Sequence, residues 1–85
     1  MKFTVTWFPS AEQRLTELWL AASDKAGVSA AADEIDKILG SNPLGVGEVR
    51  TRKIRHLNIP PLAVYFEVSL LDRVVVVRDV WQPPT

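Results

Sequence analysis

The sequence contains no cysteine and only one histidine. The lack of cysteine excludes disulfide bonds, thiolate nucleophiles and cysteine-ligated zinc sites, so no metal or other cofactor is expected. Long apolar runs are also absent, since even the valines of Val74–Val77 stop after four residues, and a membrane-spanning helix needs about 20. The first six residues lack the apolar stretch of a secretory signal. We therefore expect a cytoplasmic protein with no membrane contact.

Neither sign of charge dominates, because ten basic residues balance ten acidic ones. The distribution is uneven, however: residues 1–48 contain four basic and seven acidic residues, whereas residues 49–85 contain six basic and three acidic. A neutral chain has no general field, so a nucleic acid or an acidic partner must bind to a local basic patch. A chain of 85 residues has room for one hydrophobic core, and residues 1–85 are expected to form a single domain.

The first half of the chain has the pattern of one strand followed by two helices. Apolar residues alternate with threonine over Phe3–Trp7, which predicts a half-buried strand. Ser10 is the expected N-cap of a first helix over residues 11–23, with Gln13 in the capping-box position. A second helix is expected to end before Gly40. Its apolar residues at helical spacing are Val28, Ala31, Ala32, Ile35, Ile38 and Leu39.

The second half predicts three strands, at Val49–Ile59, Leu62–Val68 and Val74–Trp81. The hairpin loop Ser69–Arg73 contains two leucines, which either contact a partner or fold back over the core. The resulting order, β-α-α-β-β-β, predicts an α+β fold in which a helical hairpin packs on one face of a mostly antiparallel sheet. The expected core consists of Phe3, Val5, Leu15, Leu18, Trp19, Ile35, Ile38, Val64, Phe66, Val74 and Val76.

An uninterrupted basic segment is the strongest local feature of the sequence. On a continuous strand, Arg50, Arg52 and His56 would point to one side, and Lys53 and Arg55 to the other. Metal-free RNA cleavage needs cations near the phosphate and a group that moves the 2′-OH proton, so Arg55 and His56 are candidate catalytic residues. The four cations are also candidates for binding a nucleic acid or an acidic segment of a protein partner. A third interpretation is a solvated edge strand whose charges oppose aggregation.

Residues of the last two strands have both a functional and a structural interpretation. Arg78 is a third candidate catalytic residue, because it could contact a phosphate, but an ion pair with a cross-strand acid such as Glu67 would make it scaffold. Strand alternation places Arg78 and Asp79 on opposite faces. Tyr65 could stack on a base, although its role as a strand former is preferred, and Trp81 is expected mainly to pack in the core.

Four segments, in this order, resemble RelE/ParE toxins of type II toxin–antitoxin systems. They are FTVTWFPSAEQRLTELW at residues 3–19, IDKILGSNPLGVGEVR at 35–50, RHLNIPPLAVYFEV at 55–68 and DRVVVVRDVWQ at 72–82. The resemblance implies a toxin that inhibits growth, contributes to plasmid stabilisation and is neutralised by a cognate antitoxin. Antitoxin tails in this family are acidic, so the resemblance makes the four cations of the basic segment candidates for antitoxin binding. It also implies that oligomers form only through the antitoxin complex, and that the target is either ribosome-associated mRNA or DNA gyrase.

The sequence departs from this family at positions that matter for RNA cleavage. Ala63 occupies a place where RNA-cleaving members usually carry an arginine. The segment Trp81–Thr85 contains none of the arginine, tyrosine or histidine residues that they place at the end of the chain. The resemblance therefore predicts weak or no mRNA cleavage and leaves the endoribonuclease activity open. It favours either a gyrase-directed toxin or a degenerate, non-catalytic protein that acts only as a protein-binding module.

Overall fold

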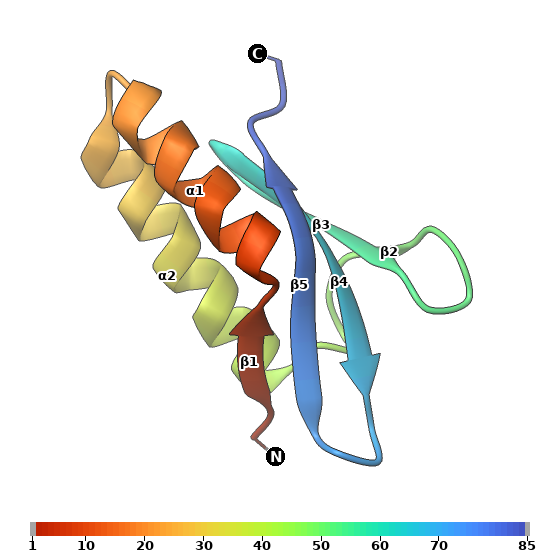
Figure 1. Ribbon diagram of the computed structural model, residues 1–85. Helices are drawn as coiled ribbons and strands as arrows, with labels where there is room; N and C mark the ends of the chain where they lie inside the picture. Colours follow the sequence, from red (N-terminus) through yellow and green to blue (C-terminus); the bar gives the residue numbers. More distant parts are fainter. Residues whose placement is uncertain (1, 85) are drawn as a thin grey trace.

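The computed structural model describes residues 2–84 and contains two helices and one five-stranded sheet (Figure 1). The elements are β1 (Thr4–Trp7), α1 (Pro9–Ala21), α2 (Lys25–Ser41), β2 (Glu48–Val49), β3 (Arg55–Ile59), β4 (Leu62–Ser69) and β5 (Val74–Trp81). The strand order is β1-β5-β4-β3-β2, with β1 parallel to β5 and all other neighbours antiparallel. Both helices lie on one face of the sheet (Figure 1), which confirms the expected α+β architecture.

Helix α1 begins earlier than the sequence predicts. Pro9 occupies the first turn, where its missing N–H costs nothing, and Phe8 is the N-cap without a side-chain hydrogen bond. The expected N-cap role of Ser10 is therefore wrong, because Ser10 already lies within the helix. At the other end, the Lys25 ammonium donates to the carbonyl oxygens of Leu20 at 3.2 Å and Ala22 at 3.1 Å. These bonds satisfy carbonyl groups that the end of a helix leaves free.

Helix α2 extends beyond its expected end and includes Gly40. The carbonyl oxygen of Gly40 accepts a hydrogen bond from the Phe3 N–H at 2.8 Å, which joins the helix to the chain just before β1. A Cβ atom at this position would lie 3.6 Å from the Phe3 carbonyl oxygen, an ordinary van der Waals distance, so Gly40 neither ends the helix nor is required by this contact. The helix ends at Ser41, and its C-cap Asn42 stands immediately before Pro43, because a proline disfavours helical geometry in the residue before it.

The two helices are joined to each other and to the sheet by tryptophan side chains. The Trp19 indole N–H donates to the Ser29 hydroxyl at 3.0 Å, across the helical hairpin. The Trp7 indole N–H donates to the Asp36 carboxylate at 2.8 Å, between β1 and α2. Trp19 remains 37% exposed, so its expected place in the core is wrong. Within residues 2–84, neither helix has the length and apolar character needed to cross a membrane.

The core lies between the helices and the sheet, and its largest fully buried side chains are Phe66, Ile35, Leu39, Leu62, Val28, Val64, Val75, Val77 and Val80. This confirms Ile35, Val64 and Phe66 as core residues. The remaining expected core residues Phe3, Val5, Leu15, Leu18 and Ile38 pack against this cluster and are only partly buried. The expectation for Val74 and Val76 is wrong, because Val75 and Val77 face the helices instead.

A β-bulge in β5 sets which of its residues face the core. Tyr65 of β4 pairs with Asp79, but its neighbour Phe66 pairs with Val77, so Arg78 is the extra residue. A bulge of this kind lets two consecutive residues avoid the core face. Both Arg78 and Asp79 are accordingly exposed, whereas Val77 and Val80 are buried. The predicted placement of Arg78 and Asp79 on opposite faces is therefore wrong.

Replacing Asp24 with alanine should lower the free energy of unfolding by about 1 kcal/mol, the usual cost of removing an N-cap. Asp24 is the N-cap of α2, and its carboxylate accepts a hydrogen bond from the Gly27 N–H at 3.0 Å. Urea denaturation followed by circular dichroism measures the loss. Asp33→Ala, at an exposed position inside α2, is the matched control and should change stability by less than about 0.5 kcal/mol. Equal losses in the two variants would contradict the capping role.

Candidate functional site

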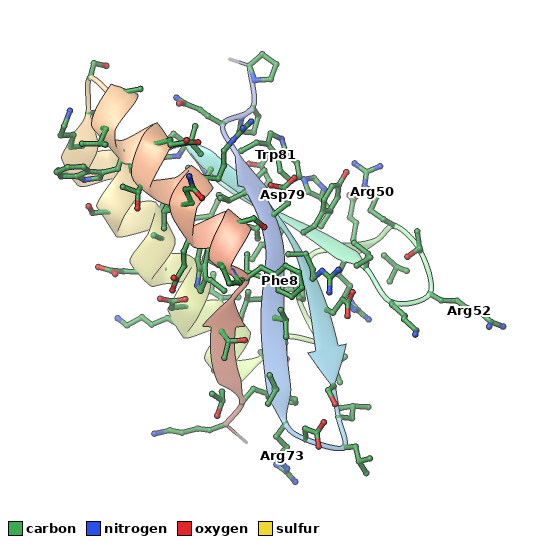
Figure 2. All side chains as sticks on the ribbon, in the orientation of Figure 1. Phe8, Arg50, Arg52, Arg73, Asp79 and Trp81 are labelled. Atoms are coloured by element: carbon green, nitrogen blue, oxygen red, sulfur yellow. The ribbon has the colours of Figure 1, made fainter. Side chains whose placement is uncertain are left out.

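The basic segment forms a hairpin instead of the single bent strand that the sequence predicts. Strand β2 ends at Val49, and β3 begins at Arg55. The Arg50 N–H donates to the carbonyl oxygen of Ile54 at 2.9 Å, while the Thr51 hydroxyl oxygen accepts from the Ile54 N–H at 3.2 Å. These bonds close a loop, so the alternation expected for a continuous strand is wrong. Arg52 extends from the loop into solvent (Figure 2).

A glycine allows this hairpin to start close to the sheet. Gly47 has a φ angle of 75°, a value that residues with a side chain rarely adopt. A Cβ atom there would lie only 2.5 Å from the carbonyl oxygen of His56. The residue therefore places β2 directly against β3, in register with the segment that contains Arg55 and His56.

A cleft with a volume of about 440 Å³ is lined by residues of this hairpin and of the end of β4. The cationic side chains that line it come from Arg52, Lys53 and Arg55. Its apolar lining residues are Leu44, Val49 and Val68, and the polar ones are Thr51, Glu67 and Ser69. Leu44 and Val49 are 45% and 62% exposed. We call this feature the basic cleft; it combines positive charge with accessible apolar surface, as a site for an acidic amphipathic segment requires.

The structure does not bring the three candidate catalytic residues together. Arg55 pairs with Phe66 across β3 and β4, so its side chain lies on the face that the helices cover. His56, the next residue, pairs with Tyr65 and lies on the opposite, helix-free face. Arg78 also lies on the helix-free face. Arg55 can therefore act in the basic cleft, but it does not face the same surface as His56 and Arg78.

Three aromatic rings meet on the helix-free face, one from each of β3, β4 and β5. The His56 ring stacks on the Trp81 ring, with centroids 5.6 Å apart and an interplanar angle of 13°. The Tyr65 ring lies 4.7 Å from Trp81 and 5.9 Å from His56. We call these residues the ring cluster. Trp81 thus lies outside the core, and the cluster could not be read from the sequence because it depends on the pairing of three strands.

Arg78 is held by two neighbours on the helix-free face. Its guanidinium forms an ion pair with Glu67, with an N–O distance of 3.6 Å, as the sequence suggested. The same guanidinium lies 4.0 Å from the centre of the Phe8 ring, in a cation–π contact. The Arg78 side chain is 41% exposed, so the ion pair contributes at most about 1 kcal/mol. Within residues 2–84 the guanidinium makes no cation–π contact with a ring of the cluster.

The remaining candidate positions have plain structural outcomes. Ala63 is fully buried and pairs with Trp81, so only a methyl group lies where the resembled family usually has an arginine. Leu70 and Leu71 are 62% and 95% exposed at the hairpin tip, so they do not fold back over the core. Within residues 2–84, histidine and acidic side chains form no group of three suited to a metal ion.

Comparison with solved structures identifies the fold of this chain. No family model and no curated protein matches the sequence. Among solved structures, the RelBE2 toxin–antitoxin complex from Mycobacterium tuberculosis contains a chain with 16% identity and a TM-score of 0.79, covering 98% of this chain and 93% of that one. The chromosomal ParDE system from P. aeruginosa gives 14% identity and a TM-score of 0.74, with 98% of both chains covered. The archaeal RelE–RelB complex from Pyrococcus horikoshii gives 17% identity and a TM-score of 0.71, with 96% of both chains covered. The chain therefore has the fold of the RelE/ParE toxins.

Proposed function

We propose that this chain is the toxin of a type II toxin–antitoxin system and that it acts by binding a protein target rather than by cleaving RNA. The observation that supports protein binding over RNA cleavage is the separation of the candidate catalytic groups. Arg55 faces one side of the sheet and His56 the other, and Arg78 is occupied by Glu67 and Phe8. Cleavage of RNA without a metal requires a base, an acid and a cation around one phosphate.

The similar structures support a protein partner, since those from M. tuberculosis, P. aeruginosa and P. horikoshii are toxin–antitoxin systems or complexes. We infer that the cognate antitoxin binds the basic cleft through an acidic, amphipathic segment. The cleft offers Arg52, Lys53 and Arg55 for its carboxylates, and Leu44 and Val49 for its apolar side chains. Arg50 lies on the same hairpin loop and adds to the positive field.

DNA gyrase is the target that best fits a toxin without a cleavage site, because the RelE/ParE toxins that the sequence resembles include members directed at gyrase. We infer a cytoplasmic location, where gyrase and ribosomes are found. A second candidate function is RNA cleavage on the ribosome. The ring cluster favours it, because exposed aromatic rings can stack on bases and one of them, His56, can transfer protons. A degenerate protein that only binds its antitoxin is the remaining alternative.

Expression of the chain alone should arrest growth of a bacterial host, and co-expression of an antitoxin encoded beside its gene should restore growth. In a translation extract the purified chain should cleave mRNA about 100-fold more slowly than a RelE toxin, or not at all, because it lacks a complete acid–base pair. Purified gyrase should lose supercoiling activity in its presence. Ribosome-dependent cleavage at a RelE-like rate would establish the second candidate function. Normal growth, with intact gyrase activity and mRNA, would leave only the degenerate binding module.

A further inference from the structure

Four side chains form a row across the helix-free face of the sheet. Glu48 of β2 pairs with His56 of β3, His56 pairs with Tyr65 of β4, and Tyr65 pairs with Asp79 of β5. Cross-strand partners project from the same face of a sheet with Cβ atoms about 5 Å apart. The row therefore has a carboxylate at each end and two aromatic rings between them. The Trp81 ring stands beside it, in contact with both His56 and Tyr65.

The charges around this row favour a cation over a phosphate. Glu48 and Asp79 are both exposed, and neither forms an ion pair within residues 2–84. Arg78, the cation next to Asp79 in the chain, is already paired with Glu67. The cations of the basic cleft include Arg55, which projects from the other face of the sheet. An anionic backbone laid over the rings would thus meet two carboxylates that are not neutralised by an ion pair within residues 2–84, whereas a cation would be attracted by them.

Arg50 is a cation near the Glu48 end of the row, two residues after Glu48 in the chain. It follows β2 directly in the chain and extends along the helix-free side of the hairpin (Figure 2). Within residues 2–84 it forms no ion pair and no cation–π contact. Its charge opposes the entry of another cation and would assist the entry of a phosphate. Replacing Arg50 should therefore change the affinity for a cationic ligand and for a phosphate ligand in opposite directions.

We propose that this row, with Trp81, binds an arginine side chain presented by a protein partner. A guanidinium is planar, stacks on aromatic rings and donates paired hydrogen bonds to carboxylates, whereas a lysine ammonium offers only a compact charge. The rings supply the stacking surface, and Glu48 and Asp79 supply acceptors on both sides. The proposal does not depend on the toxin function, because it concerns a face opposite the helices and a chemistry opposite to that of the basic cleft.

The test is a nuclear magnetic resonance titration of the ¹⁵N-labelled full chain with three probes: a peptide containing three arginines, the same peptide with lysines, and an oligouridylate. The indole N–H of Trp81 reports on the row. The indoles of Trp7 and Trp19, which are bonded to Asp36 and Ser29, serve as internal references. The arginine peptide should shift the Trp81 signal, and should bind about three-fold or more tighter than the lysine peptide, because only the guanidinium stacks.

Two variants and one control test which side chains contribute to binding of the arginine peptide. The double variant Glu48→Gln/Asp79→Asn should weaken binding of the arginine peptide about five-fold or more, as expected for two lost charge contacts. Asp79 accepts the Val80 N–H at 2.9 Å, and the amide oxygen of the substituted side chain can still accept that bond. Arg50→Gln should strengthen binding of the same peptide. Glu12→Gln/Glu17→Gln changes the net charge equally on exposed positions of α1 and should have no effect.

Three results would overturn the proposal. The first is preferential binding of the oligouridylate at Trp81. The second is weaker binding of the arginine peptide by Arg50→Gln, and the third is an unaltered affinity in the Glu48→Gln/Asp79→Asn variant.

Discussion

Replacing Arg52 and Lys53 with glutamate should weaken binding of the proposed antitoxin about five-fold or more. Both side chains are exposed and line the basic cleft. Each exposed ion pair is worth about 0–1 kcal/mol, and reversal replaces attraction by repulsion, so the pair together should cost about 1–3 kcal/mol. A loss of about 1.4 kcal/mol corresponds to a ten-fold change in Kd. Isothermal titration calorimetry with the proposed antitoxin measures it.

Arg55 is best reversed separately, because it is half-buried on the helix-covered face. A carboxylate there would disturb folding as well as binding, whereas reversal of Arg52 and Lys53 should leave the Tm nearly unchanged. Arg14→Glu/Lys37→Glu, at exposed helical positions, is the control with the same change in net charge and should retain affinity. Wild-type binding should also weaken as salt rises, since charges are screened over about 8 Å at physiological ionic strength. An affinity indifferent to both salt and reversal would identify the hairpin as a solvated edge.

Truncation of Phe66 to alanine should produce the largest loss of stability, about 3–5 kcal/mol. Phe66 is fully buried and pairs with Val77 at the bulge of β5, so its removal leaves a cavity under the centre of the sheet. A domain of this size commonly has a total stability of about 5–15 kcal/mol. The variant should therefore unfold at a much lower urea concentration, or fail to fold at 37 °C. Urea denaturation followed by tryptophan fluorescence gives the difference.

Two valine variants test the register on which this prediction depends. Val75 is fully buried on the helix side, whereas Val76 is partly exposed on the helix-free face. Val75→Ala should cost about 2 kcal/mol, and Val76→Ala less than about 1 kcal/mol, because only the first leaves a cavity. A reversed order would mean that β5 presents its other set of side chains to the core.

The helices and the order of elements could be predicted because apolar residues recur at helical spacing from Leu15 to Leu39 and at strand spacing around Val64. The register of β5 could not. Four consecutive valines contain no alternation, and the bulge at Arg78 is fixed by pairing with β4 rather than by a local signal. The break between β2 and β3 cannot be predicted for a similar reason, since residues 50–54 contain neither glycine nor proline.

The candidate site was predicted only in part. The basic character of the hairpin and the pairing of Arg78 with Glu67 follow from residue type and strand order. The ring cluster does not, because His56, Tyr65 and Trp81 are brought together by two registers at once. Their separate residue types suit a sheet scaffold equally well. Contacts of this kind become visible only when the pairing of all three strands is known.

The parallel pairing of β1 with β5 constrains how the chain folds during synthesis. Thr4 lies opposite Val74 in the sheet, so β1 cannot pair in the sheet until β5 has been synthesised. Until then, α1 and α2 have little of the sheet against which to bury their apolar faces, and contacts so distant in sequence slow folding. Between the completion of α2 at Ser41 and that of β5 at Trp81, the nascent chain consequently holds a helical hairpin and an unpaired strand. A chaperone or a partner present at translation would meet that species before the finished domain exists.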